Sequence, residues 1–365
     1  MSEREPDSEV GDPAAVVTIA GLAKRFGAQT AVSDLDLDVE AGEALALLGP
    51  SGCGKTTTLR LIAGFERPDA GTIRLAGTEV AGPDEFVAPE RRRIGVVFQD
   101  YALFPHLSVR DNVGFGVRDA TVRGATIRDH RVAEMLDLVG LADKAARRPH
   151  ELSGGEQQRV AIARALAPDP EIVLLDEPFS NLDAALRGRV REEVRDILRR
   201  AGATAVIVTH DQEEALSVAD RVAVMRSGRI LQCASPSELY DLPADRFVAT
   251  FVGDADLLPG DCDGAVVDTP LGRIPALTPA PSGPVEAVLR PEHVRLRLDG
   301  SGHATVTRVV FFGHDQLVEA RLESGHRIRA RLRPEAEFHP GERVTVNVNQ
   351  AVVVFATLGS DLPTM

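Results

Sequence analysis

The pattern of apolar and polar positions divides the chain into two parts. From about residue 16 to residue 252, four short apolar runs predict strands, at residues 43–49, 93–99, 171–177 and 204–210. Three segments with apolar residues at helical spacing predict helices, over residues 55–64, 130–141 and 189–200. Buried strands that alternate with helices form mainly parallel sheets, so an α/β fold is expected here. Two further segments read as antiparallel strands at one edge of that sheet, 17–27 and 71–80.

After about residue 254 the pattern changes to proline- and glycine-rich stretches, 254–264 and 274–284. Short closely spaced strands follow, at 285–290, 294–298, 304–313, 317–323, 327–333, 343–349 and 351–356. Such spacing with turn signals between the strands is typical of a small all-β barrel domain. We therefore expect a disordered N-terminus over 1–15, an α/β domain over 16–252 and a β-rich domain over 253–365.

Composition narrows the possible roles. The formal charge of −14, from 41 basic and 55 acidic residues, argues against a partner that needs a broad basic surface, such as nucleic acid. The chain has no apolar run near the roughly 18 residues that cross a bilayer, and its start does not read as a signal peptide. We expect a membrane role to be indirect, and the three cysteines to be free thiols in the cytosol.

A glycine-rich stretch, GPSGCGKT at 49–56, follows a predicted strand and precedes a predicted helix. It fits the pattern of a phosphate-binding loop, whose backbone N–H groups and helix N-terminus surround phosphate oxygens. Lys55, one of only three lysines in the chain, would reach the β- and γ-phosphates of ATP, and the Thr56 hydroxyl would bind Mg²⁺. The alternative is a glycine-rich turn without a ligand. The predicted nucleotide contacts are Gly49, Pro50, Ser51, Gly52, Cys53, Gly54, Lys55, Thr56 and Thr57, with the Cys53 thiol itself a bystander.

Two acids follow the apolar run at 172–175. Asp176 would emerge at the carboxyl end of its strand, where open α/β sheets bind ligands, and would reach Mg²⁺ through water. Glu177 would polarise the water that attacks the γ-phosphate. The alternative is a pair of acids that only ends a strand.

A second helix start, at Ser153, holds two glycines in its first turn. Ser153 and Glu156 fit a capping box, which explains both polar residues. It leaves Gly154 and Gly155 unexplained, because nearly any side chain should be tolerated at those positions. Two bare backbone units at a helix N-terminus would let an anion approach closely.

The stretch LSGGEQQR at 152–159 resembles the signature motif of ABC-transporter ATPases, and the resemblance extends over about 16–355. It implies a P-loop NTPase core with a helical subdomain over about 100–170. It also implies that two copies face each other head to tail, so that Ser153, Gly154 and Gly155 act in trans on ATP held by the other copy. The stretch 180–183 resembles the loop that crosses this interface, with Asp183 as its key acid.

The same resemblance assigns three more residues. Gln99 resembles the glutamine that senses Mg²⁺ and the attacking water, and His210 resembles the histidine that contacts the γ-phosphate. Without the resemblance, each would be read as a structural residue. Phe26 occupies the position of the aromatic that stacks on adenine, a kind of contact worth about 1–3 kcal/mol, with a core phenylalanine as the alternative.

Two further segments resemble parts of importer ATPases. Residues 100–116 resemble the segment that docks the membrane subunits, and residues 288–296 and 309–322 resemble the TOBE domain. The rival interpretation is a soluble ABC ATPase of DNA repair or translation. Such a protein would normally show long coiled coils, two ATPase cassettes in one chain or basic patches, and the sequence shows none of these. The expected partners are thus a second copy, two permease subunits and, indirectly, an external binding protein, at the cytoplasmic face of the membrane.

The cargo is less clear from the sequence. Stretches at 64–77, 89–109 and 311–322 look most like ferric-iron ATPases, while polyamine, thiamine and sugar importers share much of them. Four histidines in the β-rich part could suggest an iron sensor, but they lack metal-ligand spacing and are expected to be solvated or structural: His303, His314, His326 and His339.

Overall fold

The structure is a computed structural model that describes residues 15–117 and 124–357. It divides into two compact units, Met1–Pro236 and Ser237–Met365. The N-terminal segment expected to be disordered, 1–15, lies outside the described residues except for Ala15, which begins the first strand.

A six-stranded sheet lies at the centre of the first unit, with strand order β10-β9-β3-β8-β7-β6. Its strands are β3 (Ala44–Leu48), β6 (Ile94–Val97), β7 (Ile172–Asp176), β8 (Ala205–Thr209), β9 (Arg221–Arg226) and β10 (Arg229–Ala234). All neighbours pair in parallel except β9 and β10. The four predicted strands are confirmed, and so is the mainly parallel α/β fold.

The antiparallel segments form a sheet of their own, with order β2-β1-β4-β5, rather than an edge of the parallel sheet. Its strands are β1 (Ala15–Phe26), β2 (Gln29–Glu40), β4 (Ala70–Leu75) and β5 (Thr78–Ala81). The two sheets are separate because they bury apolar side chains against a common core. Leu22 and Leu35 of this sheet pack in one cluster with Leu45 of β3 and Ile62 of helix α1 (Lys55–Ala63). The helix therefore lies in a layer between the two sheets.

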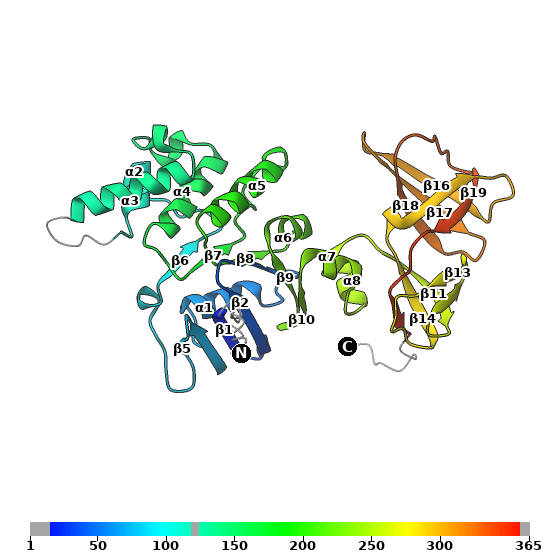
Figure 1. The fold of residues 1–365 in the computed structure, drawn as a ribbon, viewed down its shortest axis with the longest axis horizontal. Helices are drawn as coiled ribbons and strands as arrows, with labels where there is room; N and C mark the ends of the chain where they lie inside the picture. Colours follow the sequence, from blue (N-terminus) through cyan, green and yellow to red (C-terminus); the bar gives the residue numbers. More distant parts are fainter. Residues whose placement is uncertain (1–14, 118–123, 358–365) are drawn as a thin grey trace, which may run out of the picture. The chain divides into compact units, whose positions relative to one another are not determined.

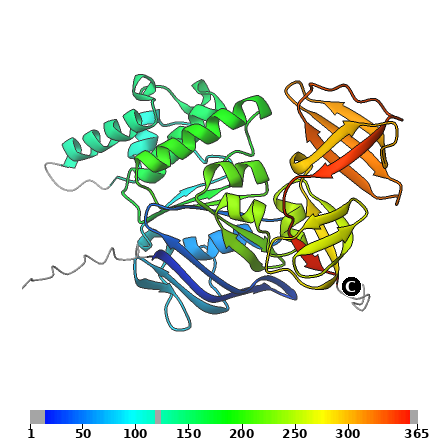
Figure 2. The same ribbon diagram turned by 45° about the vertical axis from the view of Figure 1, so that its right-hand side comes forward.

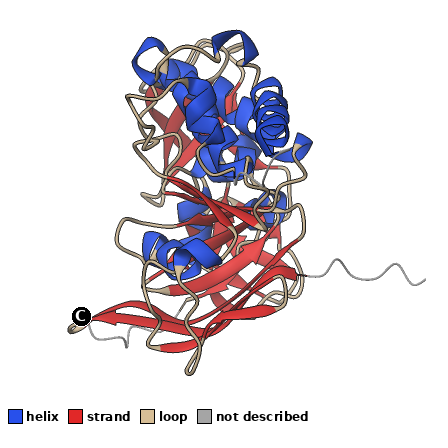
Figure 3. Ribbon diagram, turned by 90° about the vertical axis from the view of Figure 1, so that its left-hand side faces the viewer, coloured by secondary structure: helices blue, strands red, loops and turns tan. Residues whose placement is uncertain are grey.

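The other face of the parallel sheet is covered by helices. These are α2 (Val109–Gly114), α3 (Gly124–Leu138), α4 (Gly154–Leu166), α5 (Ala184–Arg200) and α6 (Gln212–Val218). Successive side chains of a strand point to opposite faces, so Leu174 packs in the core under α1 while Leu175 packs in the core under α4 and α5. Figure 1 shows α2, α3 and α4 gathered at one end of the unit, away from β1 and β2. Figure 3 shows the helices in blue and the strands in red. Short 3₁₀ helices lie at Pro89–Arg91, Ala142–Lys144, Pro149–Glu151 and Pro291–His293.

The second unit consists mainly of two antiparallel sheets, preceded by two short α-helices, α7 (Pro236–Asp241), which begins at the division, and α8 (Arg246–Val252). One sheet has the order β13-β12-β11-β14-β20, from β11 (Asp256–Cys262), β12 (Val266–Thr269), β13 (Gly272–Pro275), β14 (Gly283–Leu289) and β20 (Val354–Ala356). The other has the order β15-β19-β16-β17-β18, from β15 (Val294–Leu298), β16 (Ala304–Phe311), β17 (Gln316–Leu322), β18 (Arg327–Leu332) and β19 (Arg343–Val348). Side chains of both sheets share one core. Figure 2 shows them as two groups of strands, with β20 at the end of the yellow sheet.

The division between the units falls after Pro236, the first residue of α7, whereas the sequence pattern places the boundary at 252–253. Arg290, the residue after β14, links both helices to the β-rich unit and is only 4% exposed. Its guanidinium donates to the carbonyl oxygens of Tyr240, Ala249 and Gly253, at 2.8, 2.8 and 3.2 Å. A buried charge needs such partners, so both helices are held to the β-rich unit.

Candidate functional site

The predicted phosphate loop and the predicted residues Gln99, Asp176, Glu177 and His210 lie at or just after the ends of four parallel strands. Val97 pairs with Leu175, Asp176 with Val208, and Leu48 with Thr209. Because these strands are parallel and in register, the residues that follow them leave the sheet along one edge. That edge is the carboxyl one, where α/β sheets bind ligands.

The loop between β3 and α1 needs its glycines. Gly54 has φ of +111°, and a Cβ there would lie 2.2 Å from the carbonyl oxygen of Ala31. A Cβ on Gly49 would lie 2.4 Å from the carbonyl oxygen of Met225. Neither neighbour can move easily, because both are backbone atoms. The loop therefore keeps a bare backbone directly before the N-terminus of α1, as a phosphate cradle requires.

Lys55 lies inside this loop. Its side chain is 5% exposed, and Nζ donates to the carbonyl oxygens of Gly49 at 2.7 Å and Pro50 at 3.0 Å. A planar guanidinium is bulkier than this compact ammonium and differently shaped. The Cys53 sulfur lies 3.9 Å from Nζ, and burial raises the pKa of this thiol. Cys53 is thus a neutral packing residue, while Ser51 and Gly52 are exposed at the tip of the loop.

Asp176 and Thr56 come together at the mouth of the loop. The Thr56 hydroxyl donates to Oδ1 of Asp176 at 3.4 Å. Burial raises the pKa of the Asp176 carboxyl, whereas the hydrogen bond from Thr56 lowers it. A hydroxyl and a carboxylate are the hard oxygen donors that Mg²⁺ prefers, so the residues present fit this ion. Thr57, the next residue of α1, is half-buried.

Glu177 adopts an unusual backbone conformation. Its φ is +45°, which costs free energy for a residue with a side chain. Its N–H donates to the carbonyl oxygen of Val208 at 2.9 Å, which holds it against the next strand. Its Oε1 lies 3.2 Å from Nδ1 of His210. Strained residues of this kind cluster at active sites, and here the strain directs the carboxylate towards the imidazole.

The loop after Glu177 reaches Gln99. The side-chain amide of Asn181 donates to the carbonyl oxygen of Gln99 at 2.8 Å, and the Gln99 side chain is exposed. Asp183 lies at the N-cap of α5, exposed and without a side-chain hydrogen bond to the helix. Asn181 lies within the stretch 180–183, but its own role is not predictable from the sequence, because an asparagine in a turn carries no distinguishing signal.

The capping box at the start of α4 is confirmed. The Ser153 hydroxyl accepts from the N–H of Glu156 at 3.4 Å, and the Glu156 carboxylate accepts from the N–H of Ser153 at 2.9 Å. Lys144 forms an ion pair with the same carboxylate. The hydrogen bond from Lys144, together with the one from Ser153, lowers the pKa of Glu156 to about 2. The helix start is therefore rigid and carries a permanent carboxylate.

The expectation that nearly any side chain would be tolerated at the two glycines is wrong for Gly155. A Cβ there would lie 2.9 Å from Cγ2 of Val190, because α4 packs closely on α5. At Gly154 the nearest atom is Cδ2 of Leu182, at 3.2 Å, which leaves a tight but more adjustable contact. Packing within the chain thus accounts for one glycine. That glycine is Gly155, so a close approach to a ligand is needed only to explain Gly154.

Phe26 ends β1 and is 47% exposed. The Lys24 ammonium lies 5.2 Å from the centroid of its ring. The alternative of a core phenylalanine is therefore wrong. An exposed ring with an ordered cation beside it is free to stack on a base.

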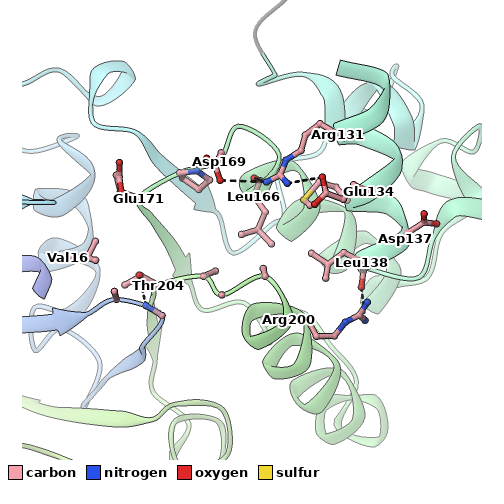
Figure 4. Close-up of a pocket in the computed structure, with 17 residues that line it drawn as sticks. Val16, Arg131, Glu134, Asp137, Leu138, Leu166, Asp169, Glu171, Arg200 and Thr204 are labelled. Carbon is pink, nitrogen blue, oxygen red and sulfur yellow. Dashed lines mark hydrogen bonds and ion pairs between the residues drawn. The ribbon is translucent and has the colours of Figure 1, made fainter. Parts of the chain in front are cut away.

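A cavity of about 610 Å³ lies elsewhere, at the amino ends of β7 and β8, and Figure 4 shows its lining. Its two arginines form hydrogen bonds to the C-terminal ends of helices. Arg131 donates to the carbonyl oxygen of Leu166 at the end of α4, and Arg200 donates to the carbonyl oxygen of Leu138 at the end of α3. Cations at helix C-termini stabilise the helix dipole. This cavity lies at the sheet edge opposite the predicted site and has a structural explanation.

A second hollow, of about 390 Å³, lies over the segment predicted to dock membrane subunits. It is lined by Phe98, Phe104, Phe115 and other residues of that region. Phe98 and Phe115 are 39% and 61% exposed. The ring of Phe104 lies 4.3 Å from that of Phe115. The buried amide of Asn112 donates to the carbonyl oxygen of Phe104 and accepts from its N–H, so the hollow has a fixed apolar floor.

Two features are absent from the described part of the chain. Residues 15–117 and 124–357 hold no cluster of three or more His, Cys, Asp or Glu side chains that could bind a metal ion. His303, His314, His326 and His339 of the β-rich unit therefore belong to no such cluster among the described residues. Among the helices described, none combines the length and the apolar character needed to cross a bilayer.

Comparison with protein-family models gives two matches. Residues 32–180 match the family described as ABC transporter, and residues 287–355 match the family described as TOBE domain. The first match covers the loop at 49–56, the start of α4 and the acids at 176–177. The second falls within the β-rich unit.

Similar proteins extend over nearly the whole chain. Fe(3+) ions import ATP-binding protein FbpC 1 of Rhodococcus jostii (strain RHA1) is 46% identical over 344 residues, which cover 92% of this chain and 98% of the relative. The spermidine/putrescine import ATP-binding protein PotA of Rubrobacter xylanophilus is also 46% identical, with 94% of both chains covered.

Among solved structures, the chain resembles the dimeric post-hydrolysis state of the ATP-binding cassette MJ0796 bound to ADP and Pi. The TM-score is 0.51 and the identity 32%, with 60% of this chain and 98% of the other covered. The chain also resembles cbiO1 from Clostridium perfringens, part of the ABC transporter complex cbiONQ, with a TM-score of 0.57 and 28% identity. This match covers 62% of this chain and 90% of the other.

Proposed function

The chain belongs to the ATP-hydrolysing subunits of ABC transporters that carry a C-terminal TOBE domain, and we propose that it drives the import of ferric iron. It would work as a peripheral protein on the cytoplasmic face of the cell membrane. Two copies would bind two permease subunits, which receive the cargo from an external binding protein.

The observation that carries the catalytic part of the proposal is the contact between Glu177 and His210. With Oε1 of the glutamate 3.2 Å from Nδ1 of the histidine, the imidazole can orient the carboxylate. Glu177 would then accept a proton from the water that attacks the γ-phosphate. His210 is exposed enough to reach a phosphate oxygen as well, since its side chain is 55% exposed.

The remaining residues of the loop edge would hold the nucleotide. Backbone N–H groups of 49–56 and the N-terminus of α1 would surround the phosphates, and Lys55 would exchange its loop acceptors for phosphate oxygens. Thr56, Asp176 and Gln99 would hold Mg²⁺, which neutralises phosphate charge when bound. Phe26 would stack on adenine.

The start of α4 would act on the nucleotide of a second copy. Helix α4 packs against α2, α3 and α5, whereas α1 packs against β7 and β8, so the two phosphate-binding helix starts belong to different parts of the unit (Figure 1). A head-to-tail pair with twofold symmetry would set each helix start on the partner's loop. Ser153, Gly154 and the exposed Asp183 would then contribute in trans, with Gly155 allowing the close packing behind them.

The apolar hollow lined by Phe98, Phe104 and Phe115 would receive an amphipathic helix of a permease subunit. Residues on both sides of Gln99 in the chain, Phe98 and Ala102, line the hollow, so a displacement of the docked helix would be linked to the nucleotide site. ATP binding would close the dimer and move the permease, and hydrolysis would reopen it.

The cargo assignment is supported by the stretches that resemble ferric-iron ATPases and by the Rhodococcus jostii relative, 46% identical over almost its full length. The equal identity of the Rubrobacter xylanophilus relative makes polyamine import the second candidate.

The choice between the two cargoes is open to direct measurement. The chain is reconstituted with its permease and binding protein in vesicles, and ATP hydrolysis is followed with ferric citrate, with spermidine or with neither. Stimulation by ferric citrate alone supports the proposal; stimulation by spermidine alone replaces it.

A further inference from the structure

The two residues that flank His210 are fixed by a closed set of hydrogen bonds. The Thr209 hydroxyl donates to Oε2 of Glu214 at 2.5 Å and accepts from the N–H of Asp211 at 3.0 Å. The N–H of Glu214 donates to Oδ1 of Asp211 at 3.1 Å. Glu214 is only 5% exposed, so its carboxylate needs these partners. The position of the His210 backbone thus depends on two acids of α6 and its cap.

One arginine of α5 faces both acids. Nη1 of Arg187 lies 3.7 Å from Oδ2 of Asp211, and its Nε lies 3.9 Å from Oε1 of Glu214. This Nε is buried and has no hydrogen-bond partner at these distances. The side chain is 31% exposed, so the charges are partly shielded from water. Arg187 therefore lies against both acids behind His210, and the positive charge of Arg191 also stabilises the Glu214 carboxylate.

The same arginine holds the loop that precedes α5. Its Nη2 donates to the carbonyl oxygen of Leu182 at 3.2 Å, and its backbone N–H donates to the carbonyl oxygen of Asp183 at 3.0 Å. At the other end of this loop, the Ser180 hydroxyl donates to the carbonyl oxygen of Glu177 at 2.9 Å. The loop 180–183 is thus tied at one end to Glu177 and at the other to Arg187.

These contacts form a ring. It runs from Glu177 through the loop 180–183 to Arg187, from Arg187 through Asp211 to His210, and from His210 back to Glu177 across the 3.2 Å contact. Arg187 is the member of this ring that joins the loop to the histidine. A displacement of the loop would therefore be transmitted to the groups that would act on the attacking water.

We propose that Arg187 is a positioning residue that couples the loop 180–183 to His210, so that the pair Glu177–His210 reaches its hydrolytic geometry only when the loop is in its place. This inference rests on the proposed function, in which the loop meets a second copy of the chain. Contact with that copy would then license hydrolysis at the site in the same chain. The link would make the two sites of a dimer dependent on each other.

The test compares three full-length variants in basal ATP hydrolysis. Arg187→Met removes the cation and keeps much of the volume, and Arg187→Lys keeps the charge but cannot reach the two acids and Leu182 together. Arg191→Met is the matched control. Arg191 also joins α5 to α6, through an ion pair with Glu213 at 3.2 Å, and also places a positive charge near Glu214, but among the described residues it forms no hydrogen bond or ion pair with the loop 180–183.

Arg187→Met is expected to lower kcat by about tenfold to a hundredfold, as misplacement of a catalytic group does. The KM for ATP should stay within about twofold, because the phosphate loop is untouched. Arg187→Lys should recover part of kcat, and Arg191→Met should keep wild-type kcat. Melting temperatures of the variants show whether a loss reflects unfolding. If Arg187→Met is unstable, Arg187→Lys alone still tests the split between kcat and KM.

The inference would be overturned if Arg187→Met and Arg191→Met lowered kcat equally. It would also be overturned if Arg187→Met lowered the melting temperature but left the kcat of the folded protein unchanged. A change in KM alone would overturn it as well. Wild-type chain that hydrolyses ATP without any dimer on sizing would overturn the composite site instead. The two failures are therefore distinguishable.

Discussion

The carboxylate of Glu177 and the imidazole of His210 lie 3.2 Å apart, although 33 positions separate them in the chain. The contact forms because β7 and β8 are parallel neighbours in register, so that the residue after each strand emerges at the same edge. A left-handed backbone at Glu177 completes the approach. The core of the sheet thus determines the geometry of the pair.

Glu177→Gln should lower ATP hydrolysis at least about a hundredfold, because the amide cannot accept the proton of the attacking water. ATP binding should remain, since the phosphate loop and Asp176 are unchanged. With binding intact and hydrolysis blocked, the variant should accumulate as an ATP-bound dimer. Size-exclusion chromatography with and without ATP measures this, and a variant that stays monomeric with ATP would count against the closed dimer.

Gly155→Ala should destabilise the first unit by roughly 1–3 kcal/mol, the usual cost of overpacking, reduced by the better helix propensity of alanine. The new methyl group would lie 2.9 Å from Cγ2 of Val190. Gly154→Ala is the control and should cost less, because the facing atom is a flexible leucine methyl at 3.2 Å. Urea unfolding compares the two.

The clash can be isolated with a second substitution. Val190→Ala removes the methyl group that Gly155→Ala would strike, so the double variant should be more stable than the sum of the single effects implies. Additive losses would show that the short contact is relieved in another way.

The capping box at α4 should make stability depend on pH. Because the folded pKa of Glu156 is lowered from 4.5 to about 2, its contribution is fully present above about pH 4.5 and is lost as the pH falls towards 2. Glu156→Gln should therefore melt below the wild type at pH 7, and the gap should narrow as the pH falls through this range. Lys144→Met should behave in the same way, and a gap independent of pH would contradict the assignment.

Much of the first unit could be predicted from the sequence because its signals are local. The strands β3, β7 and β8 are unbroken apolar runs, since both faces are buried, and the phosphate loop is a contiguous motif. In the second unit the pattern does not predict β11, β12 and β13: Pro259 and Gly272 lie within β11 and β13, and β12 has only four residues. Proline and glycine weaken a strand pattern even where they are tolerated.

The features that could not be predicted depend on contacts between distant positions. Arg290 holds α8 to the β-rich unit through the carbonyl of Ala249, 41 positions away. Gly155 owes its bare backbone to Val190 on another helix, and Arg187 reaches Asp211 on a third. In a single sequence these residues look like ordinary members of helices or strands.

The central claim is that each hydrolytic site is completed by a second copy, and a mixture of two inactive variants tests it most directly. Lys55→Ala removes the phosphate ligand, and Ser153→Arg blocks the helix start that would meet the partner's ATP. Each alone should be inactive. Random twofold pairing gives mixed dimers with one intact composite site, so the equimolar mixture should recover ATP hydrolysis, up to about a quarter of the wild-type rate. A mixture that forms dimers with ATP yet hydrolyses no faster than its two components would contradict the claim.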